Sequence, residues 1–517
     1  MSVVSHGAPD VVTPDPAPKM SKAHLIMLTG CTMLATLMQA LDSTIANVAL
    51  PYMQGSMAAS QDEINWVLTS YIVAAAIMTT PTGFLAARFG RTRLFIISIV
   101  GFTAASVLCG AAQSLSQIVT FRILQGIFGA ALVPLSQSVM LDIYPVEKRG
   151  AAMSMWGVGV MIGPVLGPIL GGWLTENYSW RWVFYINVPF GILASIGLLI
   201  FLKETSHSKS AKLDWIGFGT LSLAIGMFQI MLDRGETLDW FASPEIVIEA
   251  LLAGIGLYIF LVQFWLGPKP FLSPKLFTDI NFVVGIVIIF TNGLIMYATL
   301  ALLAPYLQTL MNYPVVTAGI VLAPRGAGLI LAAIICGRLI GKVNARVLLG
   351  IGFITTAYAL YQMTLWTPNV SEGTIISAGF TQGLGIGFVS MPLNVTTFAT
   401  VPLEQRTEAT GIYNLMRNLG SAIGISLTGA LLESNSQINH AIIAGTVTPF
   451  NRAFQTGAAS RFWNPWSMQN AAALNEEITR QANIIAYIDD FKLMLILALI
   501  TIPLVFLIRS TKKWRKM

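Results

Sequence analysis

Apolar runs longer than about 18 residues recur along nearly the whole chain, and this feature most limits what the chain can fold into. Each run is a candidate membrane-spanning helix, because a helix satisfies its own backbone hydrogen bonds in lipid. The alternation expected of a transmembrane barrel strand is missing from these runs. Hydrophobic residues make up 55% of the 517 residues and charged residues only 10%, so a soluble globular core is excluded.

About fourteen spans follow from these runs. We predict them near residues 25–50, 64–87, 94–112, 117–141, 150–174, 182–202, 214–232, 246–266, 280–304, 315–340, 346–366, 372–399, 409–432 and 491–509. Residues 1–24 are polar, contain several prolines and lack the apolar core of a signal peptide, which is typical of a short disordered tail.

Lysine and arginine gather in alternate loops. Arg88, Arg91 and Arg93 follow the second span, Lys148 follows the fourth, and the end of the chain, 510–517, is basic. The positive-inside rule then predicts that both termini are cytoplasmic and that the number of spans is even. Because the basic residues sit in short loops, the net charge of +6 does not indicate a nucleic-acid-binding face.

The chain also resembles itself at long offset. Pro145–Arg149 aligns with Pro402–Arg406, and Gly83–Arg88 aligns with Gly337–Lys342. Such internal repeats are common in membrane transporters. We therefore expect an all-α polytopic membrane protein with two six-helix halves and two extra central helices.

The repeat also divides the chain into segments. The predicted segments are a cytoplasmic tail at 1–24, an N-terminal half at 25–202, a two-helix insertion with its linkers at 203–278, a C-terminal half at 279–509, and a basic tail at 510–517.

One outer loop is unusually long. Residues 433–490 separate the last two predicted spans and contain Trp463, Trp466 and a plausible helix near 469–485. The loop is either a tolerated surface insertion or a docking surface for a partner outside the membrane.

Asp42 is a lone carboxylate inside the first apolar run. A charge at membrane depth is costly and almost always faces a cavity or a partner. By helix rise, Asp42 lies ~12 Å from the outer end of its span and Arg122 lies ~9 Å from the outer end of the fourth. Equal depth predicts a pair of opposite charges, which either exchanges protons with water or holds two helices together as a static ion pair.

Two further arginines, Arg325 and Arg417, lie deep in spans of the second half, and neither has an obvious acidic partner. They either line a watery cavity that binds substrate or donate hydrogen bonds to backbone carbonyls and to amides such as Asn394 or Asn414. Ring and amide side chains near the middle of the spans complete the set of candidate substrate-binding residues: Tyr71, Trp156, Tyr297, Tyr413, Asn394 and Asn414.

Glycine and charged residues in the loop after the second span indicate a gate at the inner side. Gly83–Arg93 is predicted to be a tight basic turn in which Gly90 permits the reversal of the chain. Arg88 and Arg91 in this turn are expected to pair with Asp142 at the inner end of the fourth span, as a latch that closes the inner side.

The fifth span holds a second group of such residues. Gly163, Pro164 and Gly167 expose backbone there for close helix packing and a local bend.

No feature of the sequence indicates an enzyme. Cys31, Cys109 and Cys336 show no metal-ligand spacing, so no metal site is predicted. There is no phosphate-binding Walker sequence and no nucleophile–base set, so neither an ATP-driven pump nor a catalytic site is expected.

At these residues the chain resembles the major facilitator superfamily. Leu41–Pro51 is similar to the first-helix signature of the fourteen-helix drug:proton antiporters, and Gly159–Gly172 is similar to their antiporter motif. Pro134–Ser138 and Ile230–Phe241 are similar to the EmrB-type subgroup. Gly83–Arg93 is similar to the loop motif of the superfamily, with one departure: Ala87 stands where that motif usually has an aspartate.

The resemblance implies proton-driven export of hydrophobic toxic compounds with no cofactor, with protons carried at Asp42 and supported by Arg122. It also implies a place in the bacterial inner membrane, beside an EmrA-like periplasmic adaptor and an outer-membrane channel. Two alternatives remain: a dedicated exporter of one metabolite, such as a siderophore or a fatty acid, and a receptor built on a transporter scaffold.

Overall fold

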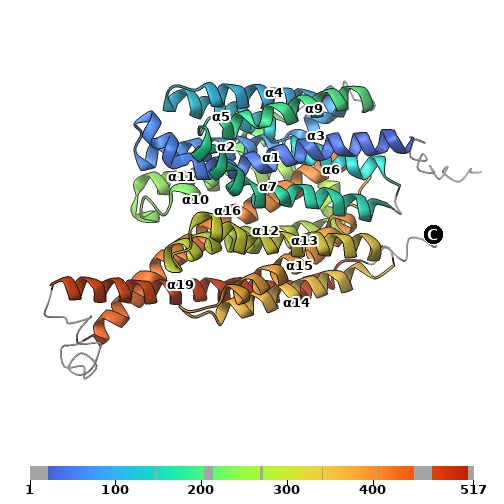
Figure 1. Cartoon of the computed structure of the whole chain (residues 1–517). Coiled ribbons are helices and arrows are strands. Elements are labelled where there is room, and N and C mark those ends of the chain that lie inside the picture. Colours follow the sequence, from blue (N-terminus) through green and yellow to red (C-terminus); the bar gives the residue numbers. More distant parts are fainter. Residues whose placement is uncertain are drawn as a thin grey trace, which may run out of the picture.

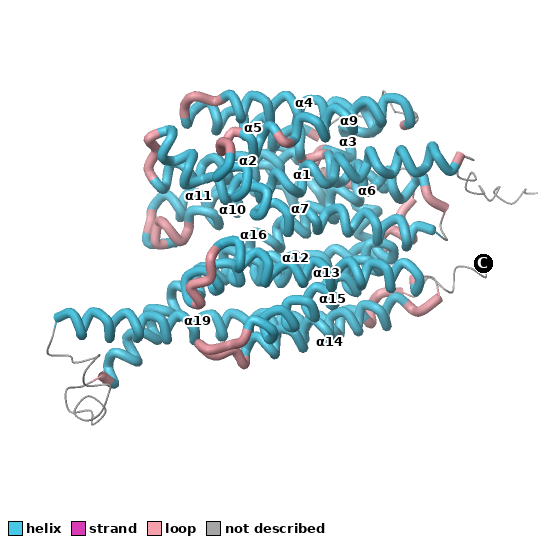
Figure 2. Tube along the Cα trace, in the orientation of Figure 1, coloured by secondary structure: helices cyan, strands magenta, loops and turns pink. Residues whose placement is uncertain are grey.

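The structure is a computed structural model that describes residues 21–145, 148–202, 214–267, 272–340, 342–402, 405–447 and 468–509. These residues form helices and short connections, with no β-strand among them (Figures 1 and 2). The helices of the first half are α1 (Lys22–Met57), α2 (Gln61–Thr79), α3 (Thr82–Phe89), α4 (Arg91–Ala111), α5 (Leu115–Gly129), α6 (Leu132–Ile143), α7 (Arg149–Asn177), α8 (Trp182–Tyr185) and α9 (Asn187–Phe201).

A helical pair and the second half follow along the chain. The pair is α10 (Trp215–Arg234) and α11 (Pro244–Leu266). The helices of the second half are α12 (Ile280–Pro305), a π-helical turn η4 (Tyr306–Leu310), α13 (Val315–Leu339), α14 (Ala345–Thr364), α15 (Glu372–Thr397), α16 (Arg406–Thr446) and α19 (Met468–Val505).

Two helical bundles lie side by side, one above the other in Figure 1. In the first bundle α1 packs on α7 and α9, and α2 packs on α5; in the second, α13 packs on α15 and α12 on α16. The pair α10 and α11 packs against itself, and α10 also touches α2 and α16, one helix from each half. The extra helices, central in the sequence, therefore bridge the two halves.

Eleven of these helices are long and apolar enough to cross a membrane, or twelve if a bent pair is counted as one span. The bent pair is α2 with α3, whose axes meet at 58° near Pro81. The long helices α7 and α19 are not among the twelve, so the number fourteen stays a prediction. The exterior of the helices carries large apolar side chains such as Ile97, Ile196 and Leu251, as expected where lipid is the solvent.

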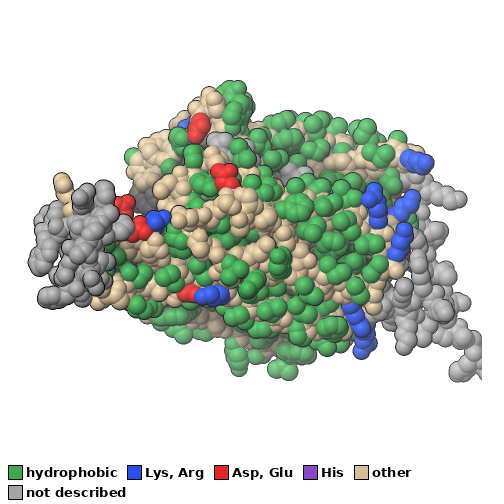
Figure 3. Space-filling model, turned by 60° about the horizontal axis from the view of Figure 1, so that its bottom comes forward, with side chains coloured by type: hydrophobic (Ala, Val, Ile, Leu, Met, Phe, Trp, Pro, Cys, Tyr) green, Lys and Arg blue, Asp and Glu red, His purple; other side chains and the backbone are tan. Residues whose placement is uncertain are grey.

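Charged side chains lie toward the two ends of this apolar body. In Figure 3 lysine and arginine gather at the end where α1 begins, whereas aspartate and glutamate appear mainly toward the opposite end. We call the end with the basic residues the inner end and the opposite end the outer end. The gathering of lysine and arginine at one end agrees with their predicted place in alternate loops, and the direction of the chain in a membrane stays a prediction.

The described part of the predicted outer loop at 433–490 is helical: the helix predicted near 469–485 is confirmed as part of α19, whereas the continuation of α16 was not predicted. α16 continues without a break to Thr446, and α19 is a single helix from Met468, so both rise beyond the apolar bundle (Figure 1). Ser436 donates a hydrogen bond to Asn483 between them. At the outer end of α19, Arg480 donates two hydrogen bonds to Glu477 and holds the pKa of that carboxyl below its usual range. Trp463 and Trp466 lie outside the described residues.

Candidate functional site

Asp42 and Arg122 meet in the interior of the first half. Arg122 Nη1 donates to Asp42 Oδ2 at 2.7 Å, and the two side chains are 1% and 0% exposed. α1 and α5 carry them at matching depth, as the sequence predicted. An ion pair so fully removed from water is costly unless hydrogen bonds satisfy its remaining atoms.

Those further hydrogen bonds come from neutral side chains. Gln125 Nε2 and Asn187 Nδ2 each donate to Asp42 Oδ1 at 2.8 Å, so both carboxylate oxygens accept hydrogen bonds. Gln125 Oε1 also accepts from Arg122 at 2.8 Å, and Ser106 accepts from Gln125 at 2.7 Å. The sequence reasoning missed Ser106 and Asn187, because a single polar residue on an apolar helix gives no signal of where it points.

Aromatic rings and a backbone carbonyl hold the guanidinium in place. Arg122 Nε donates to the carbonyl of Val67 at 3.0 Å, and the guanidinium lies 4.1 Å from the centre of the Tyr71 ring and 5.7 Å from that of Phe184. Tyr71 was predicted to bind substrate; it lies instead against the Asp42–Arg122 pair, and it lines neither pocket described below.

The glycine-rich face of α7 positions α1 beside this pair. A Cβ at Gly163 would overlap the backbone of Ala40, and a Cβ at Gly167 would overlap the side chain of Thr44. Thr44 donates to the carbonyl of Gly163 at 3.2 Å. The glycines therefore let α7 approach the segment of α1 that carries Asp42. Pro164 lies in α7, and its side chain is outside the described part of the structure.

The inner side of the molecule is closed by a charge cluster between the halves. Asp142 on α6 accepts from Arg91 on α4, as predicted, and also from Arg406 Nη1 on α16 at 2.7 Å. Arg406 belongs to the opposite half, so this hydrogen bond crosses the interface. The sequence had suggested Arg88 as the second partner of Asp142; the second ion pair in the structure is with Arg406.

Neutral side chains continue this closure toward the middle of the molecule. Gln137 donates to Asn394 Oδ1 and accepts from Asn414 Nδ2, each at 2.8 Å, and so ties α6 to α15 and α16. Thr410 donates to the carbonyl of Pro134 at 3.2 Å. All of these bonds join the two halves, and all must break for the inner side to open.

The predicted tight turn at Gly83–Arg93 is shorter than expected. Helix α3 continues to Phe89, and only Gly90, with φ 92°, has the left-handed backbone that favours glycine. Gly83 lies inside α3 and not in the turn, and a Cβ there would overlap Glu408 of α16. Gly83 therefore permits a second close approach of the halves at the inner end.

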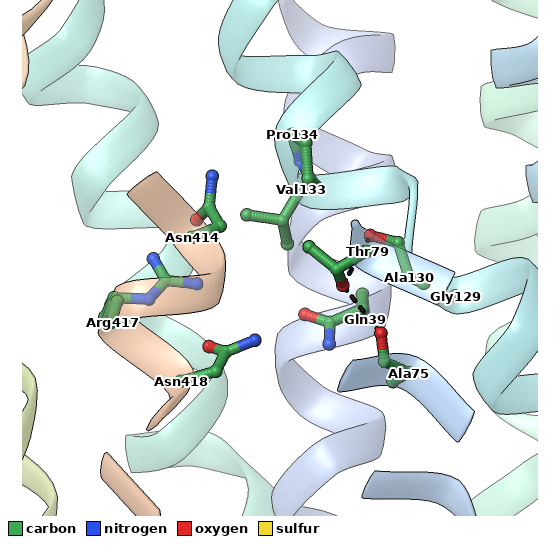
Figure 4. Close-up of a pocket in the computed structure, with 10 residues that line it drawn as sticks. All are labelled: Gln39, Ala75, Thr79, Gly129, Ala130, Val133, Pro134, Asn414, Arg417 and Asn418. Carbon is green, nitrogen blue, oxygen red and sulfur yellow. Dashed lines mark hydrogen bonds between the residues drawn. The ribbon is translucent and has the colours of Figure 1, made fainter. Parts of the chain in front are cut away.

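Two pockets lie between the halves, on the outer side of this closure. The first is a narrow cavity of about 20 Å³, and Figure 4 shows Asn414, Arg417 and Asn418 of α16 facing Gln39 of α1 across it. The second cavity has a similar volume, about 20 Å³, so in this arrangement the two halves lie close together around both. Six of the predicted substrate residues line one or both pockets: Trp156, Tyr297, Asn394, Tyr413, Asn414 and Arg417.

Arg417 is shared by both pockets and is the charged residue of each lining. It forms no ion pair within the described residues, and its buried Nε has no hydrogen-bond partner. The buried hydroxyl of Tyr413 and the Oδ1 of Asn414 also lack partners. The pockets therefore combine apolar and aromatic walls with a positive charge and several unused polar atoms, a lining that suits amphipathic small molecules.

Arg325 lies elsewhere. It is buried beside α15, where the backbone at Gly383 approaches it, and its Nη2 donates to the carbonyl of Met296 at 2.9 Å. This is the backbone hydrogen bonding that the sequence left open for Arg325, and the residue lines neither pocket. In the described residues no group of three His, Cys, Asp or Glu side chains is placed to hold a metal ion.

Comparison with known proteins assigns the chain to a family. A model of the Major Facilitator Superfamily matches residues 32–425. The chain is 36% identical to the fatty acid resistance protein FarB of Neisseria gonorrhoeae, over 95% of this chain and 97% of that protein. It is 34% identical to the multidrug export protein EmrB of Escherichia coli K12, over 91% and 92% of the two chains.

Solved structures agree on the fold. The proton:xylose symporter XylE has a TM-score of 0.58 at 14% identity, covering 92% of this chain and 97% of that one. The human organic anion transporter MFSD10 gives a TM-score of 0.58 at 13% identity, covering 92% and 99%. The predicted all-α major facilitator fold is thus confirmed, and the chain belongs to the major facilitator superfamily as an EmrB-like multi-pass membrane transporter rather than an enzyme.

Proposed function

We propose that this protein exports hydrophobic small molecules across a bacterial inner membrane and that protons moving inward drive the export. The observation that supports proton coupling is the state of Asp42, which is removed from water and accepts hydrogen bonds from Arg122, Gln125 and Asn187. All three donors favour the charged carboxylate, and protonation would weaken all three bonds at once. Proton uptake would therefore release α1 from α5 and α9.

The transport cycle that we propose alternates between two closures. In the arrangement seen here the inner side is closed by Asp142, Arg406 and Gln137. A proton from the outer side neutralises Asp42, the first half reorients, and the inner bonds break. Substrate then enters from the cytoplasm or the inner leaflet, and proton release inward accompanies the return. The drive is the proton gradient, and no cofactor takes part.

The decisive experiment uses the protein in reconstituted vesicles. We expect drug-induced proton release from the wild type with several chemically unrelated compounds. Asp42→Asn should abolish proton release and uphill transport, yet keep downhill equilibration of the same drug, because the amide preserves the size of the side chain. If Asp42 serves only a static ion pair, both activities will fall together; a variant that still pumps normally would exclude the proton role.

A second candidate is a dedicated exporter of one metabolite, such as a siderophore or a fatty acid. Arg417 favours an anionic cargo, since it is a cation without an ion-pair partner in both pockets. The relative FarB, by its name, confers resistance to fatty acids. A transport screen separates the two: a specialist moves long-chain fatty acids and ignores cationic dyes, and its transport of fatty acids falls in Arg417→Gln but persists in Arg417→Lys.

We further propose that the outer parts of α16 and α19 contact an EmrA-like adaptor that leads to an outer-membrane channel. Support comes from the way both helices rise beyond the apolar bundle, to Thr446 and from Met468 (Figure 1). Replacing the segment that connects them, 447–467, by a short linker should spare transport in vesicles while lowering the resistance of cells. An equal loss in vesicles would contradict the docking role.

A further inference from the structure

An aromatic cluster fills the outer end of the second half. Helix α12 ends in the π-helical turn η4, which places the ring of Tyr306 5.4 Å from that of Trp366 and 5.3 Å from that of Tyr487. The ring of Trp366 lies 5.7 Å from that of Phe491. All four side chains are buried. Isolated π-turns often mark functional sites in helices.

Asp490 lies on α19 within this cluster. It follows Tyr487 by three positions, so these two side chains share one face of α19. Asp490 is 0% exposed, and neither carboxylate oxygen has a hydrogen-bond partner. The hydroxyl of Tyr306 and the Nε1 of Trp366 are also buried without partners. A carboxyl group and two potential donors therefore share one cluster without bonding in this state.

No positive charge compensates Asp490 in the described part of the chain. It takes part in none of the ion pairs found there, whereas its neighbour Asp489 pairs with Lys492 at 2.9 Å. The titratable or charged groups of the helices packed against this part of α19 are Tyr306 of η4, Tyr358 and Tyr361 of α14, and Glu433 of α16. These are neutral or negative at physiological pH, so none of them favours a charged Asp490.

Asp490 and Asp42 belong to different bundles. Asp42 lies twenty residues after the start of α1 at Lys22, or roughly 30 Å, and Asp490 lies fifteen residues before the end of α19 at Val505, or roughly 22 Å. α1 is the first helix of its half, and α19 is the last helix of the other half. Each half thus buries one carboxyl group on a helix at its edge in the sequence.

We propose that Asp490 is a second proton-binding group of the transport cycle, protonated in the state seen here and charged in another state. A buried carboxyl without a donor or a cation is stable only in its neutral form. When the second half reorients, the Tyr306 hydroxyl and the Trp366 indole N–H become the donors that a charged Asp490 needs. The proton that Asp490 loses passes to water on the side then open. This inference rests on the proposed proton-driven export.

The test compares Asp490→Asn with the matched control Asp489→Asn, one position away and partly exposed. Wild type and both variants are reconstituted in vesicles, and the proton-to-drug ratio is obtained from the proton gradient that just balances an opposing drug gradient. We expect Asp490→Asn to lower the ratio by one proton per drug molecule and Asp489→Asn to leave it unchanged. An unchanged ratio in Asp490→Asn, with wild-type transport coupled to protons, overturns the inference.

The same measurement distinguishes this inference from proton coupling itself. If export is not coupled to protons, the proton-to-drug ratio of the wild type is zero; if only the role of Asp490 is wrong, the wild-type ratio is above zero and Asp490→Asn leaves it unchanged. Infrared spectroscopy provides a second measurement if Asp490→Asn does not fold. Wild-type protein should show the carbonyl band of a buried protonated carboxylic acid, and Asp490→Glu should shift this band while Asp489→Glu leaves it in place. A spectrum in which Asp490→Glu shifts no such band also overturns the inference.

Discussion

Replacing Arg406 by glutamine is expected to open the inner side of the transporter. Arg406 donates to Asp142 across the interface of the halves at 2.7 Å, and the two side chains are 8% and 17% exposed. A hydrogen bond to a charged group contributes about 1.5–3 kcal/mol. Because Asp142 keeps its second partner, Arg91, we use the lower value. Loss of about 1.5 kcal/mol shifts the equilibrium toward the inward-open state roughly tenfold.

Thiol labelling measures this shift. Thr410 is 0% exposed and donates to Pro134 across the closed interface, so a cysteine at this position reacts only when the inner side opens. The native cysteines are first replaced by serine. In inside-out vesicles, Arg406→Gln should raise the labelling rate by a membrane-impermeant maleimide about tenfold.

The control for this experiment is Arg91→Gln, which removes the partner of Asp142 from the same half. It changes the charge of the cluster equally but leaves the bond between the halves, so its effect on labelling should be much smaller. Equal labelling in the two variants would refute the reasoning, because the net charge of the cluster, not the crossing bond, would then decide the closure. An unchanged rate in Arg406→Gln would refute it as well.

Three further predictions concern packing, closure and pH. Gly167→Ala should abolish transport and lower the melting temperature in detergent, because its Cβ overlaps α1, whereas Gly172→Ala, with 3.8 Å of room, should be tolerated. Gln137→Ala removes two crossing hydrogen bonds and should raise inner labelling as Arg406→Gln does. The hydrogen bonds from Arg480 lower the pKa of the Glu477 carboxyl, so Glu477 contributes to stability above the ordinary pKa of a glutamate, and this contribution is lost as pH falls through the lowered pKa of the folded protein. Amide hydrogen exchange at 468–485 should accelerate in that pH range.

The sequence predicts the buried pair but not its surroundings. Asp42 and Arg122 are predictable because a charged side chain at membrane depth is costly unless it faces a cavity or a partner, and helix rise gives the depth of each residue. Asn187 and Ser106 are not, since a neutral polar side chain is compatible with any face of its helix. Which amide meets the carboxylate depends on the rotation and packing of α9 against α1 and α4, and hydropathy carries no information about either.

The inner closure was predicted only within one half. Arg91 at the start of α4 and Asp142 near the end of α6 both fall at the inner ends of their predicted spans, so their pairing follows from the placement of the spans. Arg406 appeared in the sequence only as the repeat counterpart of Arg149, and a repeat indicates equivalent positions, not contact between them. The structure places Arg149 against the carbonyl of Leu141 and Arg406 across the interface, so equivalent residues have different partners.

The length of the outer helices was missed for a related reason. Polar residues such as Glu433 and Gln437 end the apolar run, and an apolar run reports contact with lipid rather than the continuity of a helix. Backbone hydrogen bonds continue a helix wherever no residue interrupts them, and α16 accordingly reaches Thr446.

The 41 residues of α16 form a rod about 60 Å long. Arg406 lies at the inner end of this helix, in the inner closure, and Arg417 lies beside the pockets. The outer end of the helix extends beyond the bundle (Figure 1). Thr446 lies farther from Arg417 along this helix than Arg406 does. A tilt of α16 about the level of Arg417 that moves Arg406 out of the closure therefore moves the outer end through a larger distance. A partner bound to this outer end would therefore be displaced when the inner closure opens, and its binding would oppose that opening.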